Sequence, residues 1–394
     1  MLKHVIRGCS VTWATVAAAV LVGTPASAQS IDALPAELKA LYTDVIPVGP
    51  SAYDDFKMPA KPWKWCHSES YMGNPWRVSM TNELKRLVDG AIAQGDVASF
   101  ELSDSNGDVP QQIAQIRAFI DKGCSVITTI AGSSTGLNDV IEAAYKAGIP
   151  VVTTASAVTS PYAVNIQHNH NVWGYDMAKG IGEQLGGSGN VLMVEGIPGS
   201  PIVEFENSGG YRGFAEYPNL NILGKVSGNW TANVTKNVIL QTLATNPAQI
   251  DAVWTTGSET RVIAEAFEEA GRPQPLITGS MSGDALGYWK DHQDSFRYYG
   301  GAILPTIAAQ NTFRAALRLL DGQQPIVNTL LVPVPEIRQE DLGKWAAPCM
   351  TVETGSIFPV APTEPLSEEA MNGYYRKGAA TPLYDYASTP SPCG

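Results

Sequence analysis

Residues Lys122–Ser156, KGCSVITTIAGSSTGLNDVIEAAYKAGIPVVTTAS, carry the pattern that decides the fold. The β-branched run Ser125–Ile130 is long enough for a buried strand and too short for a helix. Apolar residues then recur at helical spacing from Leu137 to Ala147, and Gly148 is typical of a residue that ends a helix. A second apolar strand follows at Val151–Thr154. A strand, a helix and a parallel strand within about thirty residues predict a βαβ unit.

The carboxyl ends of these two strands are the first place to expect a ligand. In parallel α/β sheets, ligands bind beyond that edge. Here the ends are Ala131–Thr135 and Ala155-Ser156, which are small and uncharged. Ser133 and Ser156 are therefore candidate binding residues.

Length and composition predict two domains with real cores. A domain takes about 150 residues, so 394 residues suggest two. Apolar residues make up 44% of the chain, which is enough for a core in each.

The first 28 residues are typical of a secretory signal peptide. Lys3 and Arg7 form a basic start, Val11–Val22 is an apolar segment too short to span a bilayer, and Ala26-Ser27-Ala28 is a cleavage site. We expect an exported, periplasmic protein that is cleaved after Ala28. Removing the signal leaves 24 basic and 38 acidic residues, and this net charge of −14 disfavours nucleic acid and anionic membranes as partners.

Four cysteines remain in the mature chain, in an oxidising compartment. Cys349 and Cys393 bracket an irregular tail that a disulfide between them could close. Cys66 and Cys124 lie in or beside predicted strands, where they could equally be small buried hydrophobic residues. None has C-x-x-C spacing, so redox catalysis and zinc binding have little support, and the pairing stays open.

Strands and helices alternate through the first half of the chain. It starts with a proline-containing lead-in, residues 29–60, and one short helical segment, Leu34–Tyr42. Besides the βαβ unit, the pattern predicts strands at 62–67 and 96–102 and helices at 76–92 and 109–122. This alternation predicts an α/β fold with an open parallel sheet covered on both faces.

The second half follows the same plan without repeating the sequence. We expect strands at 163–167, 190–195, 222–227, 252–256, 275–278, 296–303 and 329–335, and helices at 173–185, 234–244, 259–270 and 306–320, with a loop leading into a further helix at 197–207. From Glu336 the chain is proline-rich and is expected to be irregular, apart from a helical segment at Leu366–Tyr375.

Several short motifs occur in a characteristic order within residues 62–335. They are S-x-x-x-N-P-W at 70–76, AGIPVV at 147–152, N-V-x-G at 171–174, GIPGS at 196–200, NW at 229–230, PAQIDAVW at 247–254 and LDG at 320–322. Together they resemble the ribose-type periplasmic sugar-binding proteins of ABC importers, the type I periplasmic binding proteins. The resemblance implies two Rossmann-like lobes with parallel sheets, joined by a three-crossing hinge and closing over one ligand.

The resemblance also implies domain boundaries. The crossings fall near 167–169, 303–305 and 332–335. The N-lobe is then 61–167 plus 306–332, and the C-lobe is 168–305. Residues 29–60 form the lead-in, and 333–394 form the last crossing and a C-terminal tail outside the family pattern.

A sugar has apolar faces and a rim of hydroxyls, so its site needs aromatic plates and hydrogen-bonding groups. The resemblance places Trp76 and Trp230 at stacking positions, with plain core packing as the alternative. Asn74 and Ser70 match polar contacts of the first loop, although both residue types also cap helices and form turns. Arg77 could reach a hydroxyl or remain solvated.

The chain departs from the family where sugars are usually held by charged groups. Ala155-Ser156 stands in place of an Asp-Arg pair, Gly257-Ser258 of an Asn-Asp pair, Ser280-Met281-Ser282 of an Asp, and Ile303 of a Gln. We therefore expect a more aromatic and hydroxylic site, with Ser258, Met281 and Ser282 among its residues.

An insertion leaves Glu206 or Asn207 facing the position of the family's usual Arg. A buried carboxylate there is costly unless it is paired. We expect the ligand to supply the donors.

Other chemistries have less support. His168 and His170, with His67, could suggest a metal, but histidines two residues apart at a strand end are expected to be hinge hydrogen-bond partners without a third ligand at usual spacing. The glycine-rich segments lack the Lys-Ser/Thr of a P-loop, and no G-x-S-x-G elbow is present. We expect no catalysis, no cofactor and no metal.

The sequence thus predicts a monomeric periplasmic solute-binding protein. It would close on a sugar, a polyol or a related small molecule and deliver it to an ABC permease in the inner membrane. The alternatives are a ligand sensor for a chemoreceptor or sensor kinase, a binding protein for an aromatic or signal ligand, and a secreted hydrolase, for which no nucleophile–base pair is evident.

Overall fold

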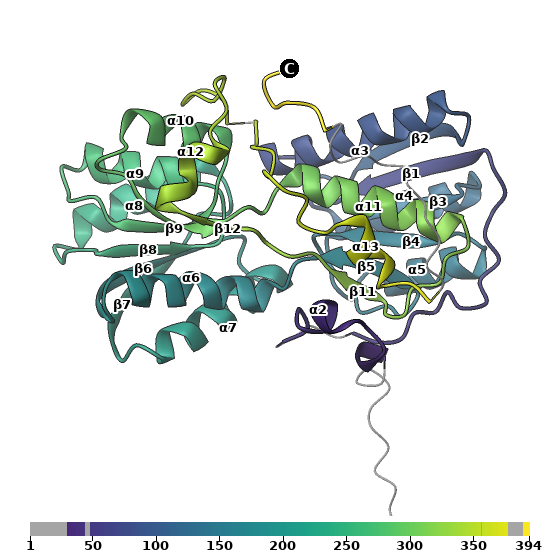
Figure 1. The fold of residues 1–394 in the computed structure, drawn as a ribbon, viewed down its shortest axis with the longest axis horizontal. Helices are drawn as coiled ribbons and strands as arrows, with labels where there is room; N and C mark the ends of the chain where they lie inside the picture. The colour runs from purple at the N-terminus through teal and green to yellow at the C-terminus, as the bar shows by residue number, and fades with distance from the viewer. Residues whose placement is uncertain (1–29, 44–47, 356, 377–388) are drawn as a thin grey trace, which may run out of the picture.

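The computed structural model describes residues 30–43, 48–355, 357–376 and 389–394. The predicted signal peptide lies outside the described residues. Within them, no helix is both long enough and apolar enough to cross a membrane. Two α/β lobes lie side by side (Figure 1), which confirms the predicted fold class.

The N-lobe contains a six-stranded, wholly parallel sheet in the order β11-β5-β4-β3-β1-β2. The strands are β1 Trp63–Glu69, β2 Val97–Asp104, β3 Val126–Ile130, β4 Val151–Thr154, β5 Ala163–Gln167 and β11 Thr329–Leu331. The helices are α3 Pro75–Ala93, α4 Val109–Asp121, α5 Asn138–Lys146 and α11 Pro305–Leu320.

Helices cover both faces of this sheet, as the continuous apolar strands require. Val126 packs into the core under α3 and α11, and its neighbour Ile127 packs into the core under α4 and α5. Successive residues of a strand point to opposite faces of the sheet, so the run SVITTI contributes side chains to both cores.

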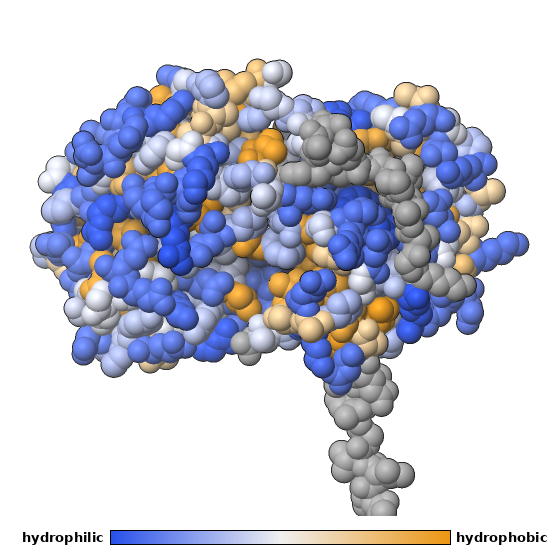
Figure 2. Space-filling view, viewed as in Figure 1, coloured by the Kyte–Doolittle hydropathy of each residue, from blue (hydrophilic) through white to orange (hydrophobic). Residues whose placement is uncertain are grey.

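The C-lobe repeats the plan with a second six-stranded sheet, in the order β12-β10-β9-β8-β6-β7. The strands are β6 Ser188–Glu195, β7 Asn219–Ser227, β8 Ala252–Thr255, β9 Leu276–Ser280, β10 Arg297–Gly301 and β12 Glu336–Arg338. The helices are α6 His170–Gln184, α7 Pro201–Ala215, α8 Ala232–Thr245, α9 Thr260–Glu269 and α10 Gly283–Asp291. Figure 2, drawn from the same side as Figure 1, shows hydrophilic residues over most of the coloured surface of both lobes. This is expected when helices turn their apolar faces to the sheets.

The chain passes between the two sheets at three places. Residues 168–169 connect β5 to α6, residues 302–304 connect β10 to α11, and residues 332–335 connect β11 to β12. The last strand, β12, pairs antiparallel with β10. The expectation that the chain is irregular from Glu336 onward was therefore wrong: an open edge of the C-lobe sheet recruits three residues as a strand.

The lead-in packs on the N-lobe. Pro50 forms an isolated bridge with Val327, and the Tyr53 side chain is buried, with its hydroxyl donating to the carbonyl of Tyr162 at 2.6 Å. The predicted helical segment shortens to α2, Ala36–Lys39. These contacts make the lead-in part of the N-lobe core.

The C-terminal tail contacts both lobes (Figure 1). After α12, Leu342–Trp345, the carbonyl of Ile357 accepts from the backbone N–H of Gly283 in the C-lobe at 2.7 Å. The tail then reaches the N-lobe, where α13, Glu368–Asn372, lies against α11 through ion pairs. The tail therefore adds a crossing between the lobes.

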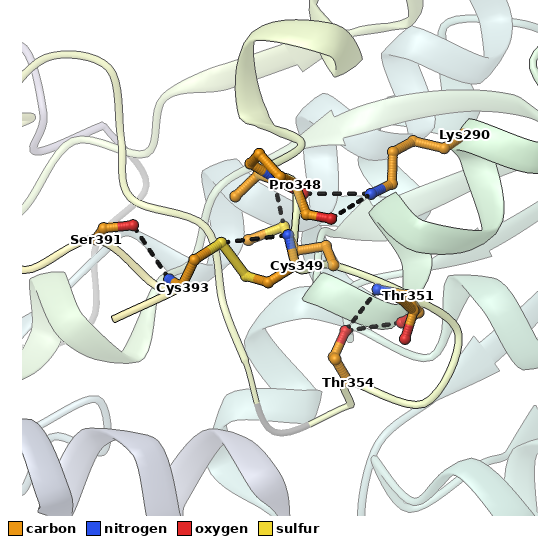
Figure 3. Close-up of a disulfide and its surroundings, with 9 residues drawn as sticks. Lys290, Pro348, Cys349, Thr351, Thr354, Ser391 and Cys393 are labelled. Carbon is orange, nitrogen blue, oxygen red and sulfur yellow. Dashed lines mark hydrogen bonds between the residues drawn. A yellow bond between two sulfur atoms is a disulfide. The ribbon is translucent and has the colours of Figure 1, made fainter.

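Two disulfides are present. Cys349–Cys393 returns the end of the tail to the C-lobe, where Lys290 donates to the carbonyls of Ala347 and Pro348 (Figure 3). Cys66 in β1 is bonded to Cys124, immediately before β3. The interpretation of this second pair as free buried thiols was wrong, because β1 and β3 are adjacent in the sheet and bring the two residues together.

Candidate functional site

A cavity of about 770 Å³, including its open mouth, lies between the lobes. Its walls come from the carboxyl ends of strands in both sheets and from two of the crossings, where parallel α/β sheets bind ligands. The lining residues are Asn74, Pro75, Trp76, Arg77, Ile130, Ala155, His168, His170, Ile202, Glu206, Trp230, Thr256, Gly257, Ser258, Glu259, Ser280 and Ile303.

Trp76 enters the wall at the start of α3. Asn74 caps this helix, because its Oδ1 accepts from the backbone N–H of Arg77 at 3.0 Å, and Pro75 occupies the first turn, where no intrahelical N–H is needed. The indole N–H of Trp76 donates to the carbonyl of Ile303 at 2.9 Å. The ring is thus anchored to the second crossing, and its only polar atom is satisfied without a ligand.

Trp230 lies on the opposite lobe, in the loop after β7. Both Asn229 and Trp230 have positive φ, 56° and 50°. Its indole is flanked by glycines: a methyl group on Gly196 would lie 2.1 Å from the ring Cε2, and one on Gly257 would lie 2.8 Å from Cδ1. The absence of side chains at these two strand ends makes the room that the indole occupies.

Arg77 is paired rather than solvated. Its guanidinium donates to Oε2 of Glu69 at 3.2 Å and to Oγ of Ser70 at 2.9 Å. Glu69 is fully buried and also accepts from the Thr81 hydroxyl at 2.9 Å. The positive charge at this wall is therefore neutralised inside the protein, and Ser70 is buried behind it, supporting Arg77 without lining the cavity.

His170 and Glu206 form a buried pair at the cavity floor. His170 Nδ1 lies 3.1 Å from Oε1 of Glu206, and its Nε2 lies 3.1 Å from the carbonyl of Ala155. A carbonyl only accepts, so Nε2 carries a proton, and the pair is either imidazolium with carboxylate or two neutral groups. The Thr256 hydroxyl donates to the other Glu206 oxygen at 2.6 Å. The expectation that the ligand must satisfy Glu206 was wrong, since the protein supplies both partners.

His168 completes a small group of potential metal-ligating atoms. One such atom from each of His168, His170 and Glu206 lies within 4.8 Å of the others. The sequence suggested no third ligand because Glu206 is far along the chain, and His67 is elsewhere, bonded to Thr128 at 2.8 Å. Burial lowers the pKa of His168 well below its usual value, and His170 lowers it further.

Glu259 is the charged residue of the cavity that sequence reasoning missed. Burial raises the pKa of its carboxyl to about 7, partly offset by backbone N–H groups of Glu259 and Ser258 and reinforced by the negative charges of Asp284 and Glu206. The available signal was its place two residues after Gly257, at the carboxyl end of β8, where the helical pattern of α9 concealed it.

The two serines predicted from the N-lobe strand ends lie outside this cavity. Ser133 Oγ accepts from the backbone N–H of Gly136 at 3.0 Å, and Ser156 Oγ donates to the carbonyl of Ala131 at 2.8 Å. The Ser133 hydroxyl stabilises its own turn, and the Ser156 hydroxyl links the end of β4 to the end of the neighbouring strand β3. Ser156 lines a second hollow instead, farther along the gap between the lobes.

Three residues predicted from the C-lobe also turn away from the cavity. Asn207 donates to Glu195 at 2.7 Å, and Met281 is fully buried in the core. The Ser282 hydroxyl bonds to Asp284 at the start of α10. The structure thus brings together six of the twelve predicted residues: Asn74, Trp76, Arg77, Glu206, Trp230 and Ser258.

Comparison with known proteins identifies the architecture. Residues 68–324 match the family described as periplasmic binding protein domain. A crystal structure of an ABC transporter solute binding protein from Thermobispora bispora superposes with a TM-score of 0.71 at 26% identity, covering 82% of this chain and 99% of that one.

Two curated relatives are similar to this chain over shorter segments. A xylitol-binding protein from Mycolicibacterium smegmatis is 26% identical over 179 residues, which are 45% of this chain and 51% of that protein. The ribose import binding protein of Escherichia coli is 23% identical over 214 residues, 53% of this chain and 69% of that protein. The chain thus spans about half the length of the first relative. With the family match extending over both lobes, this chain belongs to the periplasmic binding protein family.

Proposed function

We propose that this protein binds a small sugar-like or polyol solute between its lobes and delivers it, as a periplasmic monomer, to the permease of an ABC importer in the inner membrane. The observation that carries the proposal is one cavity with Trp76 on its N-lobe wall and Trp230 on its C-lobe wall. Aromatic side chains on two lobes can cover the apolar faces of a ring or carbon chain. The names of the xylitol-binding and ribose import relatives support this ligand class.

The residues between the tryptophans favour a ligand of modest polarity. Ile130, Ile202 and Ile303 line the cavity, and the Arg77 guanidinium is taken by Glu69. A polyol, a deoxy sugar or a furanose suits these walls better than a sugar acid, whose charge would need a free cation.

The binding step is a closure. We propose that residues 61–167 with 306–332 and residues 168–305 move as two bodies about the three crossings. A ligand that touches both tryptophan walls gains its full contacts only when the lobes are closed, so binding shifts the population toward the closed form. Export with cleavage after Ala28 is part of the proposal, and the intact mass of the exported protein would test it.

A thermal-shift screen of residues 29–394, followed by calorimetry, tests the function. The panel contains xylitol, ribitol, D-ribose, D-xylose, deoxy sugars, sugar acids and small aromatics. A hundredfold excess over Kd stabilises the folded state by about 2.7 kcal/mol, which gives a visible shift. We expect hits among polyols or neutral sugars, and hits confined to aromatics or acids would contradict the proposed ligand class. Crosslinking of the loaded protein in membranes of its own cell then distinguishes a permease from a receptor.

A further inference from the structure

Glu259 and Trp230 meet at one point of the cavity wall. A methyl group in place of the Gly257 hydrogen would lie 2.2 Å from Oε2 of Glu259 and 2.8 Å from Cδ1 of Trp230. The carboxylate and the edge of the indole therefore lie against the same face of Gly257. Both residues also line the cavity.

Glu259 has no counter-ion among the residues that the structure describes. No Lys, Arg or His there forms an ion pair with it, and backbone N–H groups alone offset the desolvation of its carboxyl. Arg261, two residues further on, forms ion pairs with Asp284 at 2.7 Å and with Glu265. Arg77, an arginine of the cavity lining, is paired with Glu69.

The other carboxylate of the cavity is already compensated. Glu206 shares a proton with His170 and accepts from Thr256, so the pair adds no net charge. Glu259 is thus the carboxylate of the cavity that, among the described residues, has only backbone N–H groups as partners. A partly buried carboxylate without a counter-ion is costly, and a cation that arrives with the ligand would offset that cost.

We infer that the natural ligand carries a protonated amine on its hydroxylated frame, as in an amino sugar or an amino polyol, and that the ammonium binds to the Glu259 carboxylate, next to the Trp230 indole. An ammonium donates up to three hydrogen bonds and brings the positive charge that this carboxylate lacks. A hydroxyl at the same place donates one hydrogen bond and brings no charge. The inference rests on the proposed function and specifies its ligand class.

Matched ligand pairs test it. Calorimetry at pH 8 compares glucosamine with glucose, galactosamine with galactose, and 1-amino-1-deoxyxylitol with xylitol. In at least one pair we expect the amine to bind ten-fold tighter or more. Glu259→Gln should reduce this ratio to about one. Glu269→Gln, at an exposed position of the same helix, is the control and should keep the ratio.

A second measurement needs no variant. For 1-amino-1-deoxyxylitol and xylitol, whose alkyl amine stays protonated over this range, the ratio of amine to neutral affinity should fall as the pH drops from 8 to 5.5, because Glu259, with its pKa of about 7, becomes protonated and loses the charge that attracts the ammonium. Asp284, Glu206, His168 and His170 are the other titratable groups near this wall, and they face the amine and the neutral member of a pair alike.

Three results would count against the inference. Neutral ligands that bind as tightly as their amines in every pair overturn it and leave the proposed function standing. A preference for the amine that persists in Glu259→Gln overturns the role of this residue. If no member of any pair binds while the thermal-shift screen gives a neutral sugar or polyol, the inference fails and the proposed function stands; if that screen gives no hit either, both fail.

Discussion

Trp230 holds a backbone conformation that large residues rarely adopt. It and Asn229 both have positive φ, at a cost of about 1–3 kcal/mol for each such residue. Two hydrogen bonds hold the start of this loop. The backbone N–H of Gly228 donates to the carbonyl of Glu195 at 2.9 Å, and the Thr235 hydroxyl donates to the carbonyl of Gly228 at 3.2 Å. Backbone strain of this kind collects at binding sites, where a side chain must be held in place.

We predict that Trp76→Ala and Trp230→Ala each weaken ligand binding by about 1–3 kcal/mol, because each removes an aromatic wall of the cavity. Calorimetry with the best ligand of the screen measures the loss. Tyr211→Ala, which truncates an aromatic side chain that is 46% exposed and outside the cavity lining, is the control and should bind normally. Unchanged affinity in both tryptophan variants would refute this location of the site.

At the scale of elements, glycines after β6 and β8 leave room for a large side chain at the ends of these strands. Gly196 follows β6 and Gly257 follows β8, and the Trp230 indole lies against both. These strands are neighbours in the sheet, so their two glycines lie at the same edge of the sheet, next to the indole.

Gly196→Ala should therefore move the indole without unfolding the lobe. The new methyl group would lie 2.1–2.6 Å from three ring atoms, which no real contact tolerates, so the ring must shift into the cavity or away from it. We expect at least a ten-fold loss of affinity with a thermal midpoint within a few degrees of wild type. Gly224→Ala in β7, where an added methyl meets nothing within 4 Å, is the matched control. Equal affinities in the two variants would show that the ring position is unimportant.

At the scale of the whole molecule, the C-terminal tail ties the lobes together on top of the three crossings. Arg314 and Arg318 of α11 are almost completely buried, and both donate to Glu368 of α13, with Arg314 also bonded to Glu364 at 2.7 Å. Burial lowers the pKa of Arg318, and the neighbouring charge of Arg314 lowers it further. On the other lobe, Cys349–Cys393 fixes the tail beside α10.

Glu368→Gln removes the charge that these two arginines share. We expect the free energy of unfolding to fall by about 1–3 kcal/mol, because the guanidinium groups stay buried with a weaker partner. Hydrogen exchange should also accelerate in peptides covering 366–376 and remain unchanged in peptides covering β8. Glu369→Gln, one residue further along and exposed, is the control. Exchange in 366–376 that does not change would show that α13 is held by its apolar contacts alone.

Most of the fold was readable from local pattern. The β-branched runs, the helical spacing and the stop at Gly148 each depend on residues within a few positions of one another, and strand and helix periods are properties of such neighbours. The order of motifs then indicated two lobes. Local pattern did not predict β12. This three-residue strand forms because it pairs with the free edge of β10.

The candidate site, too, was only partly predictable from the sequence. Trp76 and Trp230 were predicted from short motifs, S-x-x-x-N-P-W at 70–76 and NW at 229–230, that resemble a known family. The pairing of Arg77 with Glu69, the contacts of His170 with Glu206 and Ala155, and the bond between Cys66 and Cys124 join residues 8 to 58 positions apart. The sequence alone therefore determined the class of fold, since this depends on local periodicity, while Trp76 and Trp230 were candidate wall residues through the resemblance of the motif order to a known family. Only the tertiary structure decided which charges in the cavity are compensated and that Glu259 is not, because compensation is a matter of distance in space.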